Sequence, residues 1–316
     1  MKDHARPGGD LLELVKRSAL DKICVQFWSG CPNISLMDLL SYWSLQERPF
    51  ETTWDARFFF QSRDHDEALN RLGFLVGEQT MLLGMLTGEI GCGKTLTRAV
   101  FTSRLDTQRF ISASQESSAF TFSELLGNVL EQLDPSATTG AHTKHARFER
   151  LKKIVEKIHS ENKHVVLIFD EAQEMSGDTL NELKLLSNWN GNGVNFLTII
   201  LVGQPELREM VAKLPAINQR ISLRFHLRPL DLEETGNYLR HRLRVAGHPS
   251  GNLFPTDSVE RLFQVSLGIP REINRIAKLA LEFAWVKEFS EVNLNAVEAV
   301  IRDLERHQNL PRILPS

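Results

Sequence analysis

The stretch "LTGEIGCGKTLTRAV", residues 86–100, decides how the neighbouring chain should fold. It places three glycines, Gly88, Gly91 and Gly93, behind an apolar run and ahead of a lysine and a threonine. Glycine is disfavoured inside strands and helices because it loses the most conformational freedom on folding, so this crowding predicts a loop. The apolar run before it and the helical pattern after it predict a strand–loop–helix unit.

Residues 88–95 of this loop match the pattern G-x-x-x-x-G-K-[ST], which is typical of phosphate-binding P-loops. Glycines let backbone N–H groups wrap around a triphosphate, and the N-terminus of the next helix attracts the same anion. We expect Lys94 to pair with the β- and γ-phosphates of ATP and Thr95 to offer its hydroxyl to Mg²⁺. The predicted nucleotide-binding residues of this segment are Gly88, Glu89, Ile90, Gly91, Cys92, Gly93, Lys94, Thr95 and Leu96.

A second stretch, "HVVLIFDEAQ" at 164–173, ends an apolar run with two acidic residues. Ligands of parallel α/β sheets collect at the carboxyl ends of the strands, so these acids should lie near the glycine loop. We predict that Asp170 holds the Mg²⁺ shell and that Glu171 orients or deprotonates the attacking water. Together with the catalytic lysine, Lys94, the two acids predict hydrolysis of ATP.

Apolar runs predict four strands, at 81–88, 109–114, 164–171 and 196–203, and a shorter run at 224–230 predicts a fifth. Continuous apolar runs suit strands that are covered on both faces. We therefore predict an α/β fold, in which helices flank a mostly parallel five-stranded sheet.

The remaining segments divide the chain further. An aromatic-rich, non-periodic segment at 43–62 should pack by anchoring its rings, and the next segment has the apolar spacing of a helix, with Ala68, Leu69, Leu72 and Leu75 on one side. After Leu230 the pattern is helical. The predicted parts are an N-terminal extension (1–41), a nucleotide-binding α/β domain (42–230), a small helical lid domain (231–306) and a C-terminal tail (307–316).

Composition narrows the class of protein. The net charge of −3 excludes a chain that is basic throughout, although a local basic patch remains possible. No run approaches the roughly 18 apolar residues of a membrane span, so we expect no transmembrane segment. The cysteines, Cys24, Cys31 and Cys92, fit no zinc pattern, and we expect reduced thiols in a cytoplasmic protein.

Several motifs in combination resemble the ExeA-like (general secretion pathway protein A) family of AAA+ P-loop ATPases. They are "DEAQ" at 170–173, "LLSN" at 185–188, "LVGQPEL" at 201–207 and "QRI" at 219–221. The stretch "SLGIPREINRIAKLALEFA" from Ser266 resembles the lid motif of the family, and residues 42–72 resemble its amino-terminal signature. The resemblance covers residue 42 to about residue 305, and it implies an AAA+ core followed by a helical lid.

The resemblance also implies roles for matching positions. Gln204 stands where AAA+ proteins keep a polar sensor of the γ-phosphate. Arg220 stands where an arginine finger reaches the nucleotide of a neighbouring subunit, with Arg224 as second choice. Arg271 stands where a lid arginine contacts the phosphates. Such groups would offset the charge of the transferring phosphoryl group in the transition state.

Two functions follow from the resemblance. One is an ATP-dependent homo-oligomer that acts on a protein partner of a secretion or pilus assembly system. The other is a DNA-associated switch, similar to transposition ATPases of the MuB and TnsC type, with duplex DNA and a transposase as partners. Basic clusters at 144–153 and 240–244 are compatible with DNA, but their helical spacing also suits a solvated helix face. A scaffold without hydrolysis is disfavoured because Lys94, Asp170 and Glu171 are all present.

Overall fold

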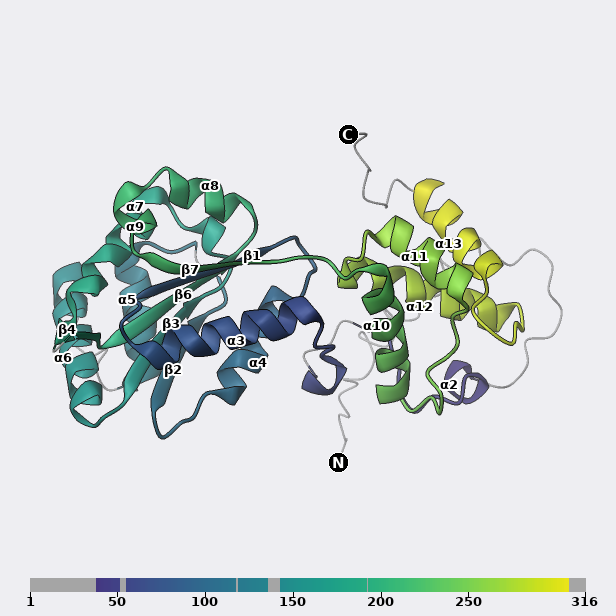
Figure 1. Cartoon of the computed structure of the whole chain (residues 1–316), viewed down its shortest axis with the longest axis horizontal. Helices are drawn as coiled ribbons and strands as arrows, with labels where there is room; N and C mark the ends of the chain where they lie inside the picture. Colours follow the sequence, from purple (N-terminus) through teal and green to yellow (C-terminus); the bar gives the residue numbers. More distant parts are fainter. Residues whose placement is uncertain (1–37, 52–54, 118, 136–142, 192, 307–316) are drawn as a thin grey trace, which may run out of the picture.

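The structure is a computed structural model, and it describes residues 38–51, 55–117, 119–135, 143–191 and 193–306. Most of the predicted N-terminal extension and the whole predicted tail lie outside the described residues. The described chain forms a sheet with helices on both faces and, beside it, a bundle of helices (Figure 1). Within these ranges no helix is both long enough and apolar enough to cross a bilayer.

The central sheet has five strands in the order β2-β3-β6-β1-β7, and every neighbouring pair is parallel. The three middle strands consist of buried residues throughout, because helices cover both faces. The predicted α/β fold with a five-stranded sheet is confirmed. The strands are β1 (Leu83–Gly88), β2 (Phe110–Gln115), β3 (His164–Phe169), β6 (Leu197–Gly203) and β7 (Ile221–Leu227).

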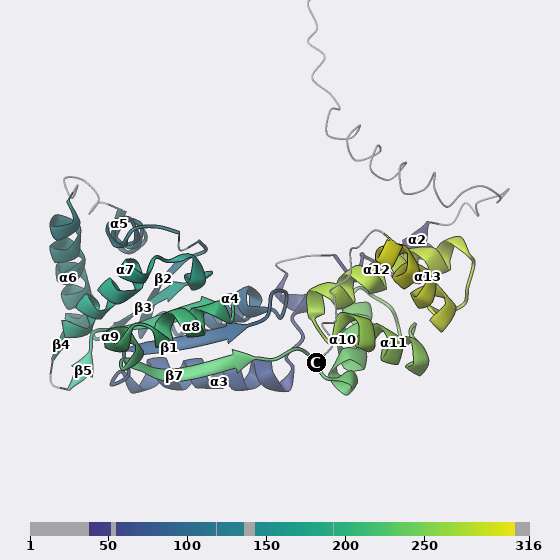
Figure 2. The same ribbon diagram turned by 90° about the horizontal axis from the view of Figure 1, so that it is seen from above.

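Helices cover both faces of the sheet (Figure 2). On the first face α3 (Arg63–Glu78) begins at Ser62, whose hydroxyl accepts a hydrogen bond from the His65 N–H, and it buries the predicted apolar stripe. Helix α4 (Lys94–Arg104) lies beside it. The opposite face is covered by α5 (Phe122–Leu133), α6 (Lys144–Ser160), α7 (Gly177–Glu182) and α8 (Glu206–Ala212).

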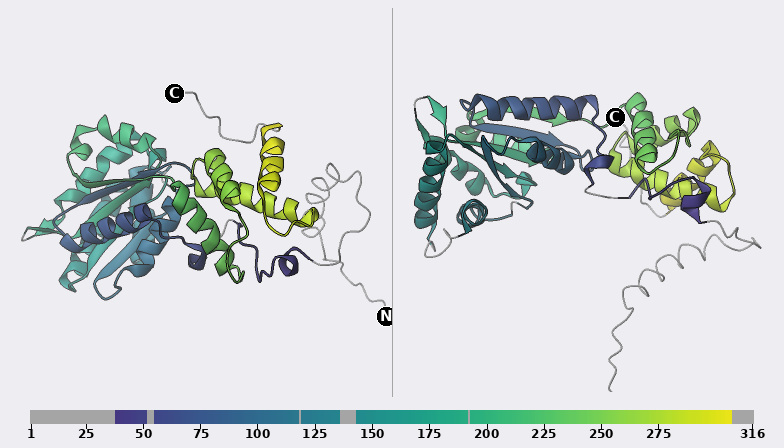
Figure 3. Two further views of the ribbon diagram at one scale, coloured as in Figure 1. Left: turned by 45° about the vertical axis from the view of Figure 1, so that its right-hand side comes forward. Right: turned by 90° about the horizontal axis from the view of Figure 1, so that it is seen from below.

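Helix α6 lies at the end of the sheet away from the helical bundle (Figures 1, 2 and 3). Short elements connect the longer helices and strands. They are α2 (Leu39–Tyr42), η1 (Ala56–Phe58), η3 (Ala172–Glu174), η4 (Leu183–Asn188), β4 (Asn190–Gly191), β5 (Val194–Asn195) and α9 (Pro215–Asn218).

The helical bundle has its own hydrophobic core, to which the segment before α3 also contributes. Trp43, Phe50 and Phe58 are buried in this core, as the aromatic-rich sequence suggests. Arg242 fastens the segment further, since its Nε donates to the Pro49 carbonyl. The bundle consists of α10 (Leu232–Val245), α11 (Thr256–Ser266), α12 (Pro270–Val286) and α13 (Leu294–Arg306).

The bundle lies beyond the carboxyl ends of β1 and β7 (Figures 1 and 2). Two ion pairs connect the start of α3 to the chain between β7 and α10. Arg63 Nη2 lies 2.8 Å from Asp231 Oδ2, and Arg228 Nη2 lies 2.7 Å from Asp64 Oδ1. The bundle is therefore held at the same edge of the sheet at which parallel strands present their ligands.

Candidate active site

The glycine loop lies between β1 and α4 and is closely packed on two sides. Gly91 and Gly93 have φ of +88° and +92°, a region that L-residues with side chains rarely occupy. A Cβ at Gly88 would lie 2.7 Å from the Leu227 carbonyl oxygen, and one at Gly91 would lie 2.7 Å from Cβ of Arg271. Backbone shape and neighbouring chain therefore explain why the loop needs glycine.

Lys94 turns its amine back into this loop. Its Nζ donates to the carbonyl oxygens of Gly88, at 2.8 Å, and of Glu89, at 3.0 Å. Burial lowers the pKa of the Lys94 amine, and the nearby charge of Glu171 opposes the shift. The Lys94 amine thus lies within the glycine loop, at the position where the sequence predicts a triphosphate.

Asp170 and Glu171 follow β3, with Asp170 buried. Burial raises the pKa of the Asp170 carboxyl, whereas hydrogen bonds from the Glu171 N–H and the Thr95 side chain lower it. The Nε of Arg98, a buried residue of α4, lies 3.1 Å from Asp170 Oδ2. Through the hydrogen bond from the Thr95 side chain, the two predicted metal-binding residues, Thr95 and Asp170, are in contact.

Glu171 has a left-handed backbone, with φ of +48°, and its carboxylate accepts hydrogen bonds from two glutamines. Gln173 Nε2 donates to Glu171 Oε2 at 2.7 Å, and Gln204 Nε2 donates to the same oxygen at 3.3 Å. The Gln204 N–H donates in turn to Gln173 Oε1 at 2.9 Å. The proposed base and the proposed sensor thus share one hydrogen-bonded cluster.

The three predicted arginines lie in different places. The Arg271 N–H donates to the Gly91 carbonyl at 3.3 Å, so the start of α12 contacts the glycine loop. Arg220 lies beside the start of β7, where its Nη1 donates to the Ala216 carbonyl and its Nε to Ser187 Oγ. Ile221 is paired there with Leu83 at the start of β1, the end opposite to the loop.

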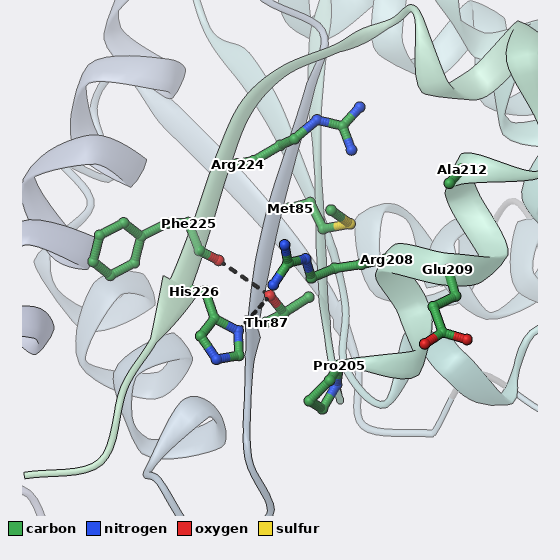
Figure 4. Close-up of a pocket in the computed structure, with 9 residues that line it drawn as sticks. All are labelled: Met85, Thr87, Pro205, Arg208, Glu209, Ala212, Arg224, Phe225 and His226. Atoms are coloured by element: carbon green, nitrogen blue, oxygen red, sulfur yellow. Dashed lines mark hydrogen bonds between the residues drawn. The ribbon is translucent and has the colours of Figure 1, made fainter. Parts of the chain in front are cut away.

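Arg224, the second choice for the finger, lies farther along β7. Its Nη2 donates to the side chain and the carbonyl of Asn218. Figure 4 shows Arg224, Arg208 and His226 around a cavity of about 600 Å³ between β7, β1 and α8. The Thr87 side chain forms part of this lining and approaches His226 Nδ1 at 3.1 Å.

Sequence reasoning missed three residues at the site: Arg98, Gln173 and His65. Arg98 stands inside the glycine-loop stretch, but only the packing of α4 onto the sheet brings it to Asp170. Gln173 lies two residues after Glu171 and bonds to it directly. His65 comes from α3 and contacts the Cys92 carbonyl. Its signal was only that a polar residue lies among the apolar positions of the helix.

Together these residues can hold an anion and act on water beside it. Backbone amides and Lys94 supply positive charge, Thr95 and Asp170 supply oxygen ligands, and Glu171 supplies a carboxylate that can accept a proton.

Known proteins resemble this chain in sequence and in fold. A profile of the AAA domain family matches residues 78–211. General secretion pathway protein A of Aeromonas hydrophila is 31% identical over 248 residues, which are 78% of this chain and 45% of that protein. The chain thus spans less than half the length of this relative.

Solved structures share the fold at lower identity. The Aeropyrum pernix ORC2 protein, solved as ADPNP–ADP complexes, has a TM-score of 0.61 and 18% identity over 82% of this chain and 72% of its own. Cdc6p from Pyrobaculum aerophilum has a TM-score of 0.56 and 16% identity over 81% and 74%. The A. pernix ORC1 protein in complex with DNA has the same score and identity over 79% and 68%. The resemblance of the motifs to the ExeA-like (general secretion pathway protein A) family of AAA+ P-loop ATPases is confirmed by the A. hydrophila relative and by the AAA-domain match.

Proposed function

We propose that the protein binds ATP at the glycine loop and hydrolyses it with Mg²⁺. One observation carries the proposal: Lys94 follows β1, and Asp170 and Glu171 follow β3, so all three lie at the carboxyl edge of the parallel sheet, where both carboxylates act on the Lys94 amine. Lys94 would exchange the loop carbonyls for the β- and γ-phosphates. Glu171, held by Gln173 and Gln204, would take a proton from the attacking water.

The donors at the site suit magnesium. A threonine hydroxyl and a buried carboxylate lie in contact, and Mg²⁺ prefers oxygen ligands of this kind. When bound, Mg²⁺ neutralises charge on the terminal phosphates. Arg98 keeps the Asp170 carboxylate oriented from the other side. Arg271, at the start of α12, would add positive charge from the lid.

Separating binding from hydrolysis tests this function. Lys94→Ala should abolish binding of a fluorescent ATP analogue, because the phosphate cradle loses its charge. Glu171→Gln should bind the analogue and release phosphate at no more than about one hundredth of the wild-type rate, the scale of a lost general base. Glu174→Gln, at an exposed acid of η3, is the matched control and should behave as wild type. Phosphate release by Glu171→Gln at the wild-type rate would assign the base to another residue.

We further propose an ATP-dependent homo-oligomer that acts in the cytoplasm on a protein of a secretion or assembly system. The name of the A. hydrophila relative supports the pathway, and the position of Arg220 away from its own loop supports assembly.

A DNA-associated switch is the alternative. Helix α6 supports it with the exposed Arg150 and Lys153, and A. pernix ORC1, which shares the fold, was solved in complex with DNA. In the other cluster, the buried Arg242 is occupied by carbonyls of the segment before α3.

Salt titration separates the two. Binding of duplex DNA should weaken steeply with salt, by about one unit of log–log slope per phosphate contacted. Arg150→Ala should reduce that slope. Absence of DNA binding with and without ATP would favour the protein partner.

A further inference from the structure

His65, near the start of α3, contacts the glycine loop from behind. The side chain is 4% exposed, and its Nε2 lies 3.2 Å from the Cys92 carbonyl oxygen. A Cβ at Gly93 would lie 3.0 Å from the same nitrogen, so ring and loop are in close contact. Phe59 packs edge-on against the ring at a centroid distance of 5.3 Å. The ring therefore has one defined position beneath the loop.

The hydrogen bonds select one tautomer of this ring. Ser62 Oγ accepts from the His65 N–H at 3.3 Å and lies 2.6 Å from His65 Nδ1. Since the Cys92 carbonyl can only accept, Nε2 must carry the hydrogen, and Nδ1 then accepts the hydroxyl hydrogen of Ser62. Burial lowers the pKa of the imidazole, against smaller opposing effects of the Cys92 carbonyl and of the charges of Asp64 and Glu234. A neutral ring agrees with this arrangement.

Because a peptide unit is planar, the hydrogen bond from His65 to the Cys92 carbonyl also determines the direction of the Gly93 N–H. In a planar trans peptide the carbonyl oxygen and the next N–H point in opposite directions. The Cys92 carbonyl and the Gly93 N–H belong to one such unit, and the structure has no cis peptide among its described residues. A donor that fixes the Cys92 oxygen behind the loop therefore also aims the Gly93 N–H away from α3.

We propose that His65 is a positioning residue for nucleotide binding, which acts by orienting the Cys92–Gly93 peptide so that the Gly93 N–H faces the phosphates. The inference rests on the proposed ATP binding at this loop. Cys92 is buried in the core, but Gly93 on the other side of this peptide has a positive φ and no side chain to restrain it. His65, held by Ser62, provides that restraint.

Two amide substitutions of different reach test the proposal. The Gln side-chain nitrogen can take the place of His Nε2, whereas the Asn nitrogen corresponds to Nδ1 and cannot reach Cys92. His65→Asn should weaken binding of a fluorescent ATP analogue by about tenfold, the scale of one hydrogen bond, and His65→Gln should stay within about threefold of wild type. Equal affinities for the two variants, whether both weak or both normal, would overturn the proposal.

Two further arms separate this role from others. Inorganic tripolyphosphate should lose competing affinity in His65→Asn by the same factor as ATP, because only the phosphates meet the loop. A loss confined to ATP would assign His65 to the base or ribose and overturn the proposal. Leu72→Ala, at a buried position of the same helix, is the control and should lower stability without changing either affinity.

The wild-type protein offers a test that needs no folded variant. Its ¹⁵N-histidine spectrum should show His65 as the neutral Nε2–H tautomer. The Nδ1–H tautomer would overturn the proposal, because Nε2 could then not donate to the carbonyl. Failure of the wild type itself to bind ATP would count instead against the proposed function, with Lys94→Ala as the reference for lost binding.

Discussion

Asp170 depends on a buried arginine that no motif singles out. The side chains of Arg98 and Asp170 are only 9% and 1% exposed, and Arg98 also reaches Glu116 at 3.4 Å. Lys94, Asp170 and Glu171 could be predicted because their spacing is fixed along one strand or loop. Arg98 and His65 could not, because their partners lie on other elements and only packing brings them together. Gln173 lies two residues after Glu171, but its bond to the Gln204 N–H depends on the position of the end of β6 beside η3.

Removal of the Arg98 charge should therefore be costly. Arg98→Met should lower the free energy of unfolding by about 3 kcal/mol, because it leaves a buried carboxylate without its counter-charge. Lys152→Met, which breaks an exposed pair with Glu156 on α6, should cost less than about 1 kcal/mol. Urea denaturation of both variants checks this. Equal losses would mean that the Asp170 pair contributes no more than a surface pair.

His164 predicts how stability depends on pH. Burial lowers the pKa of its imidazole to about 4, with a smaller contribution from the charge of His159. Nε2 lies 2.8 Å from Thr198 Oγ1. Between pH 4 and about 6.5 the unfolded chain binds the proton more readily than the folded one. His164 therefore contributes stability above pH 6.5 that is lost as pH falls toward 4.

The difference between wild type and His164→Gln isolates this residue from the other histidines. Glutamine does not titrate and can still bond to Thr198. The advantage of the wild type in unfolding free energy should shrink by roughly 2 kcal/mol from pH 7 to pH 4.5, as measured by urea denaturation. A difference that stays constant with pH would mean that His164 is protonated equally in both states.

At the scale of the element, the buried strands were predictable and the edge strand was less so. β3 and β6 are continuous apolar runs, whereas β7, at the edge of the sheet, is buried only at its two end residues and is exposed or half-buried between them. The predicted strand at 224–230 therefore starts three residues later than Ile221, where β7 begins. Before β7, Pro215 begins a new helix and so separates α9 from α8.

Gly268, between α11 and α12, is required by the backbone. Its φ is +72°, and a Cβ there would lie 1.9 Å from the Leu230 carbonyl oxygen, next to the start of the bundle. Gly268→Ala should lower the unfolding free energy by more than about 2 kcal/mol, because both strain and clash must be relieved. Gly73→Ala, in α3 with nothing within 4 Å, should instead stabilise by about 0.5–1 kcal/mol. Thermal unfolding of the pair checks the opposite signs, and like signs would contradict them.

At the scale of the molecule, the segment before α3 packs on the helical bundle. Leu39, Trp43 and Phe50 belong to the same core as α10, α12 and α13. The aromatic residues of this segment predicted that it would be anchored by buried rings. Aromatic residues do not specify the surface against which they pack, and only the tertiary structure shows that this surface is the helical bundle. After this segment the chain forms α3, which covers the sheet, and two ion pairs join the first turn of α3 to the chain before α10. The helical bundle and the glycine loop are thus connected through α3.

Arg220 lies at the end of the sheet opposite to its own glycine loop. Arg220 precedes Ile221, which pairs with Leu83 at the start of β1, and the glycine loop follows the other end of that strand. Six residues of strand span roughly 17 to 20 Å, more than an arginine side chain can bridge. If Arg220 is the finger, it must act on a neighbouring subunit, where such a group is worth about 10³-fold or more in rate.

Specific activity should then rise with protein concentration, and Arg220→Ala should bind ATP as wild type does but hydrolyse it poorly. A mixture of Arg220→Ala and Lys94→Ala should regain part of the activity. In one orientation, each mixed interface joins the intact loop of one subunit to the intact Arg220 of the other. Arg224→Ala with Lys94→Ala is the matched mixture for the second-choice finger. If the Arg220→Ala and Lys94→Ala proteins co-assemble but the mixture stays inactive, Arg220 is not the arginine finger, and Arg224 is the next candidate. A wild-type monomer with activity independent of concentration would contradict action in trans altogether.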